Sequence, residues 1–147
     1  MSFDFALQKV MNVKEQEQKN SQNQYTEAMN QFEQVATELY DLLKKKEDLE
    51  QAGREKVTKG ISIHELQSSQ SQILRLQQAI NETQHTTQLA RERMNRKQQD
   101  MVRHSIEFKK YEKMKQVKQE QFKEEQRRFE NAQMDDIAIQ LFQKRWN

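Results

Sequence analysis

The sequence predicts an all-α protein that folds as a long antiparallel two-helix coiled-coil hairpin, with residues 1–147 forming a single domain. The chain has no proline and only two glycines. With 33% hydrophobic and 33% charged residues and a mean hydropathy of −1.21, it is too polar for a compact core. Such a composition is typical of disordered chains or long solvated helices. The many unbranched side chains favour helix, because they lose little rotamer freedom there.

A first helix is expected over about residues 3–57. Its apolar residues recur at alternating steps of three and four, the period of a coiled-coil seam. The seam positions, of which only the lysine is not apolar or aromatic, are Tyr25, Ala28, Phe32, Val35, Leu39, Leu42, Lys46 and Leu49. Continued toward the N-terminus, the same frame becomes polar between Lys14 and Ser21. The seam is therefore expected to be weaker there.

A turn is expected at about residues 58–61, followed by a new helix start. Ser62 and Glu65 form the Ser-x-x-Glu pattern of a capping box. Gly60 is predicted to be the turn residue, since glycine readily adopts the left-handed conformations that end helices. Gly53 is either a second bending residue or a weak residue within the first helix.

The second helix is expected over about residues 62–142. One seven-residue frame runs through Leu66, Ile73, Ile80, Thr87, Met94, Met101, Phe108, Lys115, Phe122 and Phe129. Antiparallel pairing is predicted to bring Leu42 opposite Leu76 and Leu39 opposite Ile80. In that register about thirty C-terminal residues lack an intramolecular partner. They are predicted to be either a frayed tail or a partner surface whose aromatic residues are Phe122, Phe129, Phe142 and Trp146.

No catalytic constellation is apparent, so we expect a protein that is not an enzyme and that takes no metal, cofactor or small-molecule ligand. Cysteine is absent, which excludes disulfides and thiolate metal sites. The three histidines lie about twenty residues apart along one helix and are expected to be exposed. No apolar run is long enough to span a membrane, and no signal peptide is evident, so a cytoplasmic protein is expected.

Positive charge is concentrated between Arg91 and Lys118, where ten basic residues stand against four acidic ones in a chain of net charge +2. Three interpretations are open: a solvated helix face, a contact with an acidic protein, or a nucleic-acid contact. Nucleic acid is not the expected partner, because these charges are spread around the helix and mixed with glutamates.

Two segments resemble the FliJ family, the small soluble component of the bacterial flagellar type III export apparatus. They are "GISIHELQSSQSQILRLQQAI" from Gly60 to Ile80 and "MDDIAIQLF" from Met134 to Phe142. The resemblance implies a hairpin similar to the γ-subunit stalk of rotary ATP synthases. It also implies three partners: the hexameric export ATPase, the export gate membrane protein and export chaperones. The chain would then be cytoplasmic and peripherally associated with the membrane-embedded apparatus.

The resemblance also suggests which residues bind. The ATPase contact would use basic residues near the end that holds both termini: Arg91, Arg93, Arg96, Lys97, Arg103, Lys109 and Lys110. The gate contact would use the apex half of the hairpin, at Leu42, Leu49, Leu76 and Ala79. Two alternatives are the equivalent stalk of a virulence-type secretion system and a generic coiled-coil adaptor.

Overall fold

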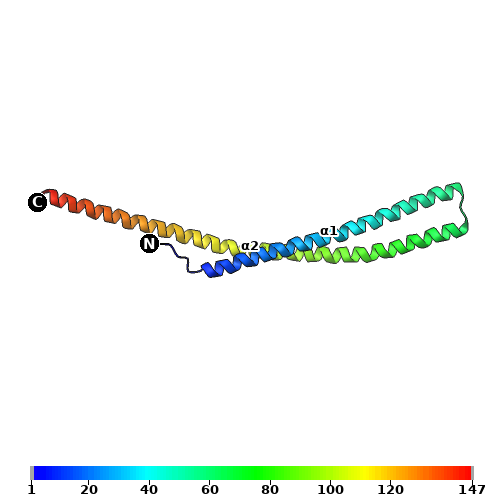
Figure 1. Cartoon of the computed structure of the whole chain (residues 1–147), viewed down its shortest axis with the longest axis horizontal. Helices are drawn as coiled ribbons and strands as arrows, with labels where there is room; N and C mark the ends of the chain where they lie inside the picture. Colours follow the sequence, from blue (N-terminus) through cyan, green and yellow to red (C-terminus); the bar gives the residue numbers. More distant parts are fainter. Residues whose placement is uncertain (1, 147) are drawn as a thin grey trace. The chain divides into compact units, whose positions relative to one another are not determined.

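The computed structural model describes residues 2–146, and the secondary structure of that part of the chain is entirely helical. It contains α1 (Gln8–Lys59) and α2 (Ile63–Trp146), which are joined by a short turn (Figure 1). The two helices pack against each other in antiparallel directions, as the sequence predicted. The chain divides into two units, which are described separately: residues 19–102, and residues 2–18 with 103–146.

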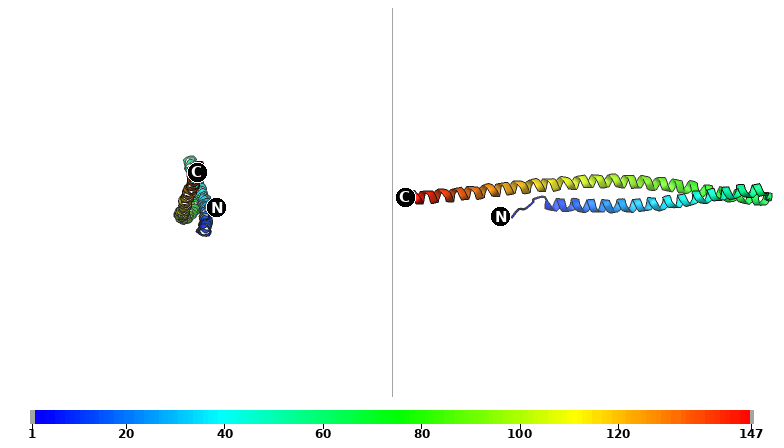
Figure 2. Two further views of the ribbon diagram at one scale, coloured as in Figure 1. Left: turned by 90° about the vertical axis from the view of Figure 1, so that its left-hand side faces the viewer. Right: turned by 90° about the horizontal axis from the view of Figure 1, so that it is seen from above.

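In the unit of residues 19–102, α1 and α2 run side by side and are joined by the turn (Figures 1 and 2). Each seam position from Tyr25 to Leu49 is buried or half-buried, which confirms the predicted seam. Ala28 and Ile80 are each only 1% exposed. Thr87 is also buried, and its hydroxyl donates a 2.7 Å hydrogen bond to the carbonyl of Thr83. The buried hydroxyl is therefore satisfied within its own helix.

The register of this pair differs from the predicted one by about one helical turn. Lys46 Nζ donates a 2.6 Å hydrogen bond to Gln77 Oε1. The predicted register instead places Lys46 opposite residue 72 or 73, which is four or five residues nearer the start of α2. Near the turn, a Cβ added to Gly53 would lie 3.7 Å from Ser69 Oγ. The predicted register places Gly53 opposite residue 65 or 66, so the shift along α2 is again about one helical turn. The predicted register is therefore wrong, although the seam residues are correctly identified.

The observed register changes which residues face each other across the seam, and at Phe32 it sets a large side chain opposite a small one. It brings Leu42 level with Ile80 rather than Leu76, and Phe32 level with Ala90. A large side chain facing a small one fits the interdigitation that coiled-coil packing requires. Lys46, which breaks the apolar stripe, is only 29% exposed at its side chain and also lies 3.7 Å from Glu50. The seam thus contains a polar layer that is paired rather than left unsatisfied.

The unit of residues 2–18 and 103–146 begins with a non-helical segment, since α1 starts at Gln8 and not near Phe3. Where the seam was expected to be weak, polar contacts join the helices. Gln18 Nε2 donates to Ser105 Oγ at 3.2 Å, and His104 Nδ1 lies 3.6 Å from Glu17 Oε2. His104 is therefore half-buried beside a carboxylate, contrary to the exposed position expected for it.

α2 continues to Trp146, four residues past the predicted end. From residue 127 to 146 every side chain is exposed. The start of this stretch is supported by local ion pairs: Glu124 lies 2.8 Å from Arg127 and 3.5 Å from Arg128. Pairs three and four residues apart stabilise a helix without a packing partner.

Candidate protein-binding surfaces

The turn between the helices spans residues 60–62, one or two residues later than predicted, because α1 ends at Lys59 and α2 begins at Ile63. Gly60 has a positive φ of 91°, which confirms it as the turn residue. Gly53 lies inside α1, so it is the weak helix residue rather than a second bend. The backbone N–H of Glu65 donates to Ser62 Oγ at 3.2 Å, which caps the start of α2. A single glycine and one cap are thus enough to reverse the chain.

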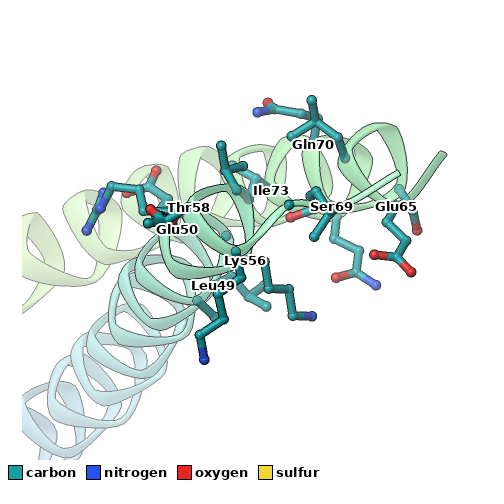
Figure 3. A pocket seen from close by; sticks show the side chains of 18 of the residues that line it. Leu49, Glu50, Lys56, Thr58, Glu65, Ser69, Gln70 and Ile73 are labelled. Carbon is teal, nitrogen blue, oxygen red and sulfur yellow. Dashed lines mark hydrogen bonds between the residues drawn. The ribbon is translucent and has the colours of Figure 1, made fainter. Parts of the chain in front are cut away.

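Beside this turn lies an open cleft between α1 and α2, with a volume of about 1110 Å³ (Figure 3). Leu49, Leu66 and Ile73 supply apolar surface to it, and Lys56 and Glu65 add charge. Leu66 is 39% exposed although it occupies a predicted seam position. The seam therefore closes less completely near the turn than at Ile80, and apolar surface stays accessible there.

The four residues expected to contact the export gate all lie in the unit of residues 19–102. Leu42, Leu49, Leu76 and Ala79 are half-buried. Leu42, Leu49 and Leu76 occupy seam positions, so part of each side chain packs between the helices and only the remainder is available to a partner. Leu49 also lines the cleft beside the turn. The structure thus places the four residues along one stretch of the helix pair.

Four of the predicted ATPase-binding residues lie in the same unit, and three of them contact α1 through neutral groups. Arg93 Nη1 donates to Gln31 Oε1 at 2.9 Å, and Lys97 Nζ donates to Gln24 Oε1 at 3.2 Å. The guanidinium of Arg91 lies 5.5 Å from the centre of the Phe32 ring. Amide and aromatic partners orient these cations without cancelling their charge.

Arg96, the fourth, is exposed. The other three predicted residues belong to the unit of residues 2–18 and 103–146. Arg103 and Lys109 are exposed, and Lys110 pairs with Glu107 on its own helix at 3.2 Å. The predicted set is therefore divided between two separately described units.

The predicted tail surface is not uniform. Phe129, Phe142 and Trp146 are 57%, 63% and 74% exposed, and the last two rings contact each other at a tilt, with centroids 5.9 Å apart. Phe122 differs, because it is half-buried against the ring of Phe3, with centroids 5.7 Å apart. Exposed apolar side chains in this number are typical of a protein contact.

The segment before α1 was not predicted to be important. It was assigned to the first helix, yet Phe5 is only 8% exposed and is one of three buried hydrophobic residues in the described part of the chain. One sequence signal could have shown that this segment is not helical. Phe3, Phe5 and Leu7 alternate with smaller or polar residues, so the apolar residues recur every two positions rather than every 3.5.

Within residues 2–146, no cluster of His, Asp or Glu is arranged to hold a metal ion. In the same range, neither helix has a stretch apolar enough to cross a membrane. His64 and His85 are exposed, as expected.

Comparison with known proteins agrees with the resemblance seen in the sequence. Residues 3–147 match the family described as flagellar FliJ protein. The flagellar FliJ protein of Bacillus subtilis (strain 168) is 35% identical over 142 residues, which cover 97% of each chain. No solved structure matches significantly, so the similarity to a rotary γ-subunit stalk stays a prediction. The match extends over almost the full length of both sequences, and the chain belongs to the flagellar FliJ protein family.

Proposed function

We propose that this chain is a non-enzymatic coupling protein of flagellar type III protein export, which binds the hexameric export ATPase and the export gate membrane protein and assists export chaperones. Family membership is the observation that carries the proposal. The flagellar name of the family and of its Bacillus relative favours this system over a virulence-type one. The location proposed is the cytoplasm, in peripheral association with the membrane-embedded apparatus.

A paired-helix architecture suits a coupling role. At about 1.5 Å per residue, the part of α1 within residues 19–102 is about 60 Å long. Paired helices of that length can present separate contacts along one stiff element.

The contact with the ATPase is proposed to use the cationic side chains named above. Arg91, Arg93 and Lys97 are oriented by a ring or an amide rather than by a carboxylate, so their charge is still available to an acidic surface. Charged groups at the edge of an interface mainly steer encounter and set specificity. We expect this contact to weaken as salt rises.

The contact with the export gate is proposed to use Leu42, Leu49, Leu76 and Ala79, together with the cleft beside the turn. Leu49 belongs to both the predicted set and the cleft lining. The half-buried state of the four residues supports a partner that packs along the seam. The exposed aromatics Phe129, Phe142 and Trp146 are proposed as a further partner surface.

The test is to mix the purified chain with its cognate export ATPase and to measure both ATP hydrolysis and the size of the ATPase oligomer. Binding with a change in either quantity is expected. The variant Arg93→Glu with Arg96→Glu should bind the ATPase at least tenfold more weakly at low salt. A tenfold loss corresponds to about 1.4 kcal/mol, within reach of two reversed contacts.

The matched control is Lys44→Glu with Lys45→Glu, which makes the same change in net charge at exposed positions of α1. It should bind the ATPase as the unmodified chain does. If both variants bind equally, the basic residues of α2 are not the ATPase contact. If the unmodified chain neither binds nor alters the ATPase, the coupling role is wrong, and salt-sensitive retention on DNA would then indicate the nucleic-acid alternative.

A further inference from the structure

The segment of residues 2–7 lies outside both helices, yet its side chains alternate between covered and exposed. Phe3, Phe5 and Leu7 are half-buried or buried, and Ser2, Asp4 and Ala6 are exposed. From Ser2 to Phe5 this alternation is the pattern of an extended backbone that lays one side on a surface, whereas Ala6 and Leu7 lie in a turn in which the Gln8 N–H donates to the Phe5 carbonyl at 3.0 Å. This segment is called the strap below.

The strap lies on a groove formed by one face of α2. The groove residues are Met114, Lys118, Gln121, Phe122 and Glu125. Their spacing of three or four residues places them along a single face of a helix. An open pocket of about 610 Å³ is lined by the strap and by these residues of α2. The strap therefore covers the groove without filling it.

An extended backbone explains where the strap reaches. Gln18 bonds Ser105 in this unit, so a continuous helix would bring Phe3 level with about residue 120 of α2. The ring of Phe3 instead packs on Phe122. A strand rises about 3.3 Å per residue against about 1.5 Å for a helix, so the extended residues 2–5 carry Phe3 about two residues further along α2 than a continuous helix would.

We propose that this groove is a binding site for an extended peptide with aromatic side chains two residues apart, and that the strap is its built-in, displaceable occupant. The ring of Phe3 packs on Phe122, Phe5 is only 8% exposed, and an open pocket remains between the strap residues and α2. Lys118 and the exposed Asp4 both line this pocket, so a competing segment with an acidic residue between its aromatic residues fits the charge of the site.

The consequence is that Phe122 is masked while the strap is seated. Of the four aromatic residues assigned to the tail surface, Phe122 is the one covered by the chain itself. A partner that needs Phe122 must displace the strap, whereas a partner that needs only Phe142 and Trp146 does not. The strap therefore selects which partners bind the middle of α2.

The experiment follows the methyl resonance of Met114 by NMR, assigned with a Met114→Leu variant of the full chain. Aromatic rings of the strap should shift this resonance. Replacing Phe3→Ala and Phe5→Ala in the full chain should move it to the position of an uncovered methionine. A synthetic peptide of residues 2–8, SFDFALQ, should then return it toward its original position.

The unmodified chain should respond to the peptide at least tenfold more weakly, because its own strap occupies the groove at a high effective concentration. The exposed-side variant Ala6→Ser and a peptide with both phenylalanines replaced by alanine are the controls, and neither should move the resonance. Unchanged helicity by circular dichroism separates strap release from unfolding. The proposal fails if the Met114 methyl resonance does not shift in the Phe3→Ala, Phe5→Ala variant, or if the peptide at millimolar concentration has no effect on it. It also fails if the peptide shifts this resonance equally in the double variant and in the unmodified chain.

Discussion

The two glycines should respond to the same substitution with opposite signs. Gly53 lies inside α1, and an added Cβ would meet Ser69 Oγ at 3.7 Å, an ordinary contact. Alanine in a helix interior is favoured over glycine by about 0.8–1.0 kcal/mol. Gly53→Ala should therefore raise the free energy of unfolding by about 0.5–1 kcal/mol. Gly60 has φ 91°, and no neighbouring atom lies within 4 Å of an added Cβ, so Gly60→Ala introduces backbone strain alone. This substitution should lower the free energy of unfolding by roughly 1–2 kcal/mol.

The assay is urea unfolding followed by circular dichroism at 222 nm, combined with amide hydrogen exchange over residues 49–73, since the turn can open locally. Gly60→Asn should lose less stability than Gly60→Ala, because asparagine is enriched at positive φ. The reasoning is refuted if Gly53→Ala destabilises the chain or if Gly60→Ala is neutral. The first outcome would contradict the helical position of Gly53 within α1, and the second would contradict the positive φ of Gly60.

Two further predictions concern the seam. Ile80→Ala should lower the free energy of unfolding by about 2–4 kcal/mol, because Ile80 is only 1% exposed and its loss leaves a cavity. Leu74→Ala, at a 65% exposed position, should change it by less than about 0.5 kcal/mol in the same urea experiment. Equal losses for the two would contradict the assigned seam. In this cysteine-free chain, Leu39→Cys with Thr83→Cys should form an intramolecular disulfide under mild oxidation, whereas Leu39→Cys with Leu76→Cys should not. Preferential oxidation of the second pair, seen as a gel-mobility shift, would show the register to be wrong.

Sequence reasoning succeeded where the signal was local or repeated. The seam from Tyr25 to Leu49 was identified because apolar residues share one helix face whatever lies opposite. The turn was identified because Gly60 and the Ser62 cap act within a few residues of each other. The binding residues were suggested by family resemblance and stay proposals.

The sequence by itself determined that the chain forms two long helices, which face of each is apolar, and where the chain reverses. Those properties depend on side-chain periodicity and on backbone preferences of nearby residues. Only the tertiary structure decided the register and the path of residues 2–7. A coiled-coil seam repeats every three or four residues, so sliding one helix by a turn exchanges one apolar neighbour for the next and leaves the pattern almost unchanged. Lys46 with Gln77, Gln18 with Ser105 and Phe3 on Phe122 distinguish these alternatives, because each depends on two residues that are far apart in the chain.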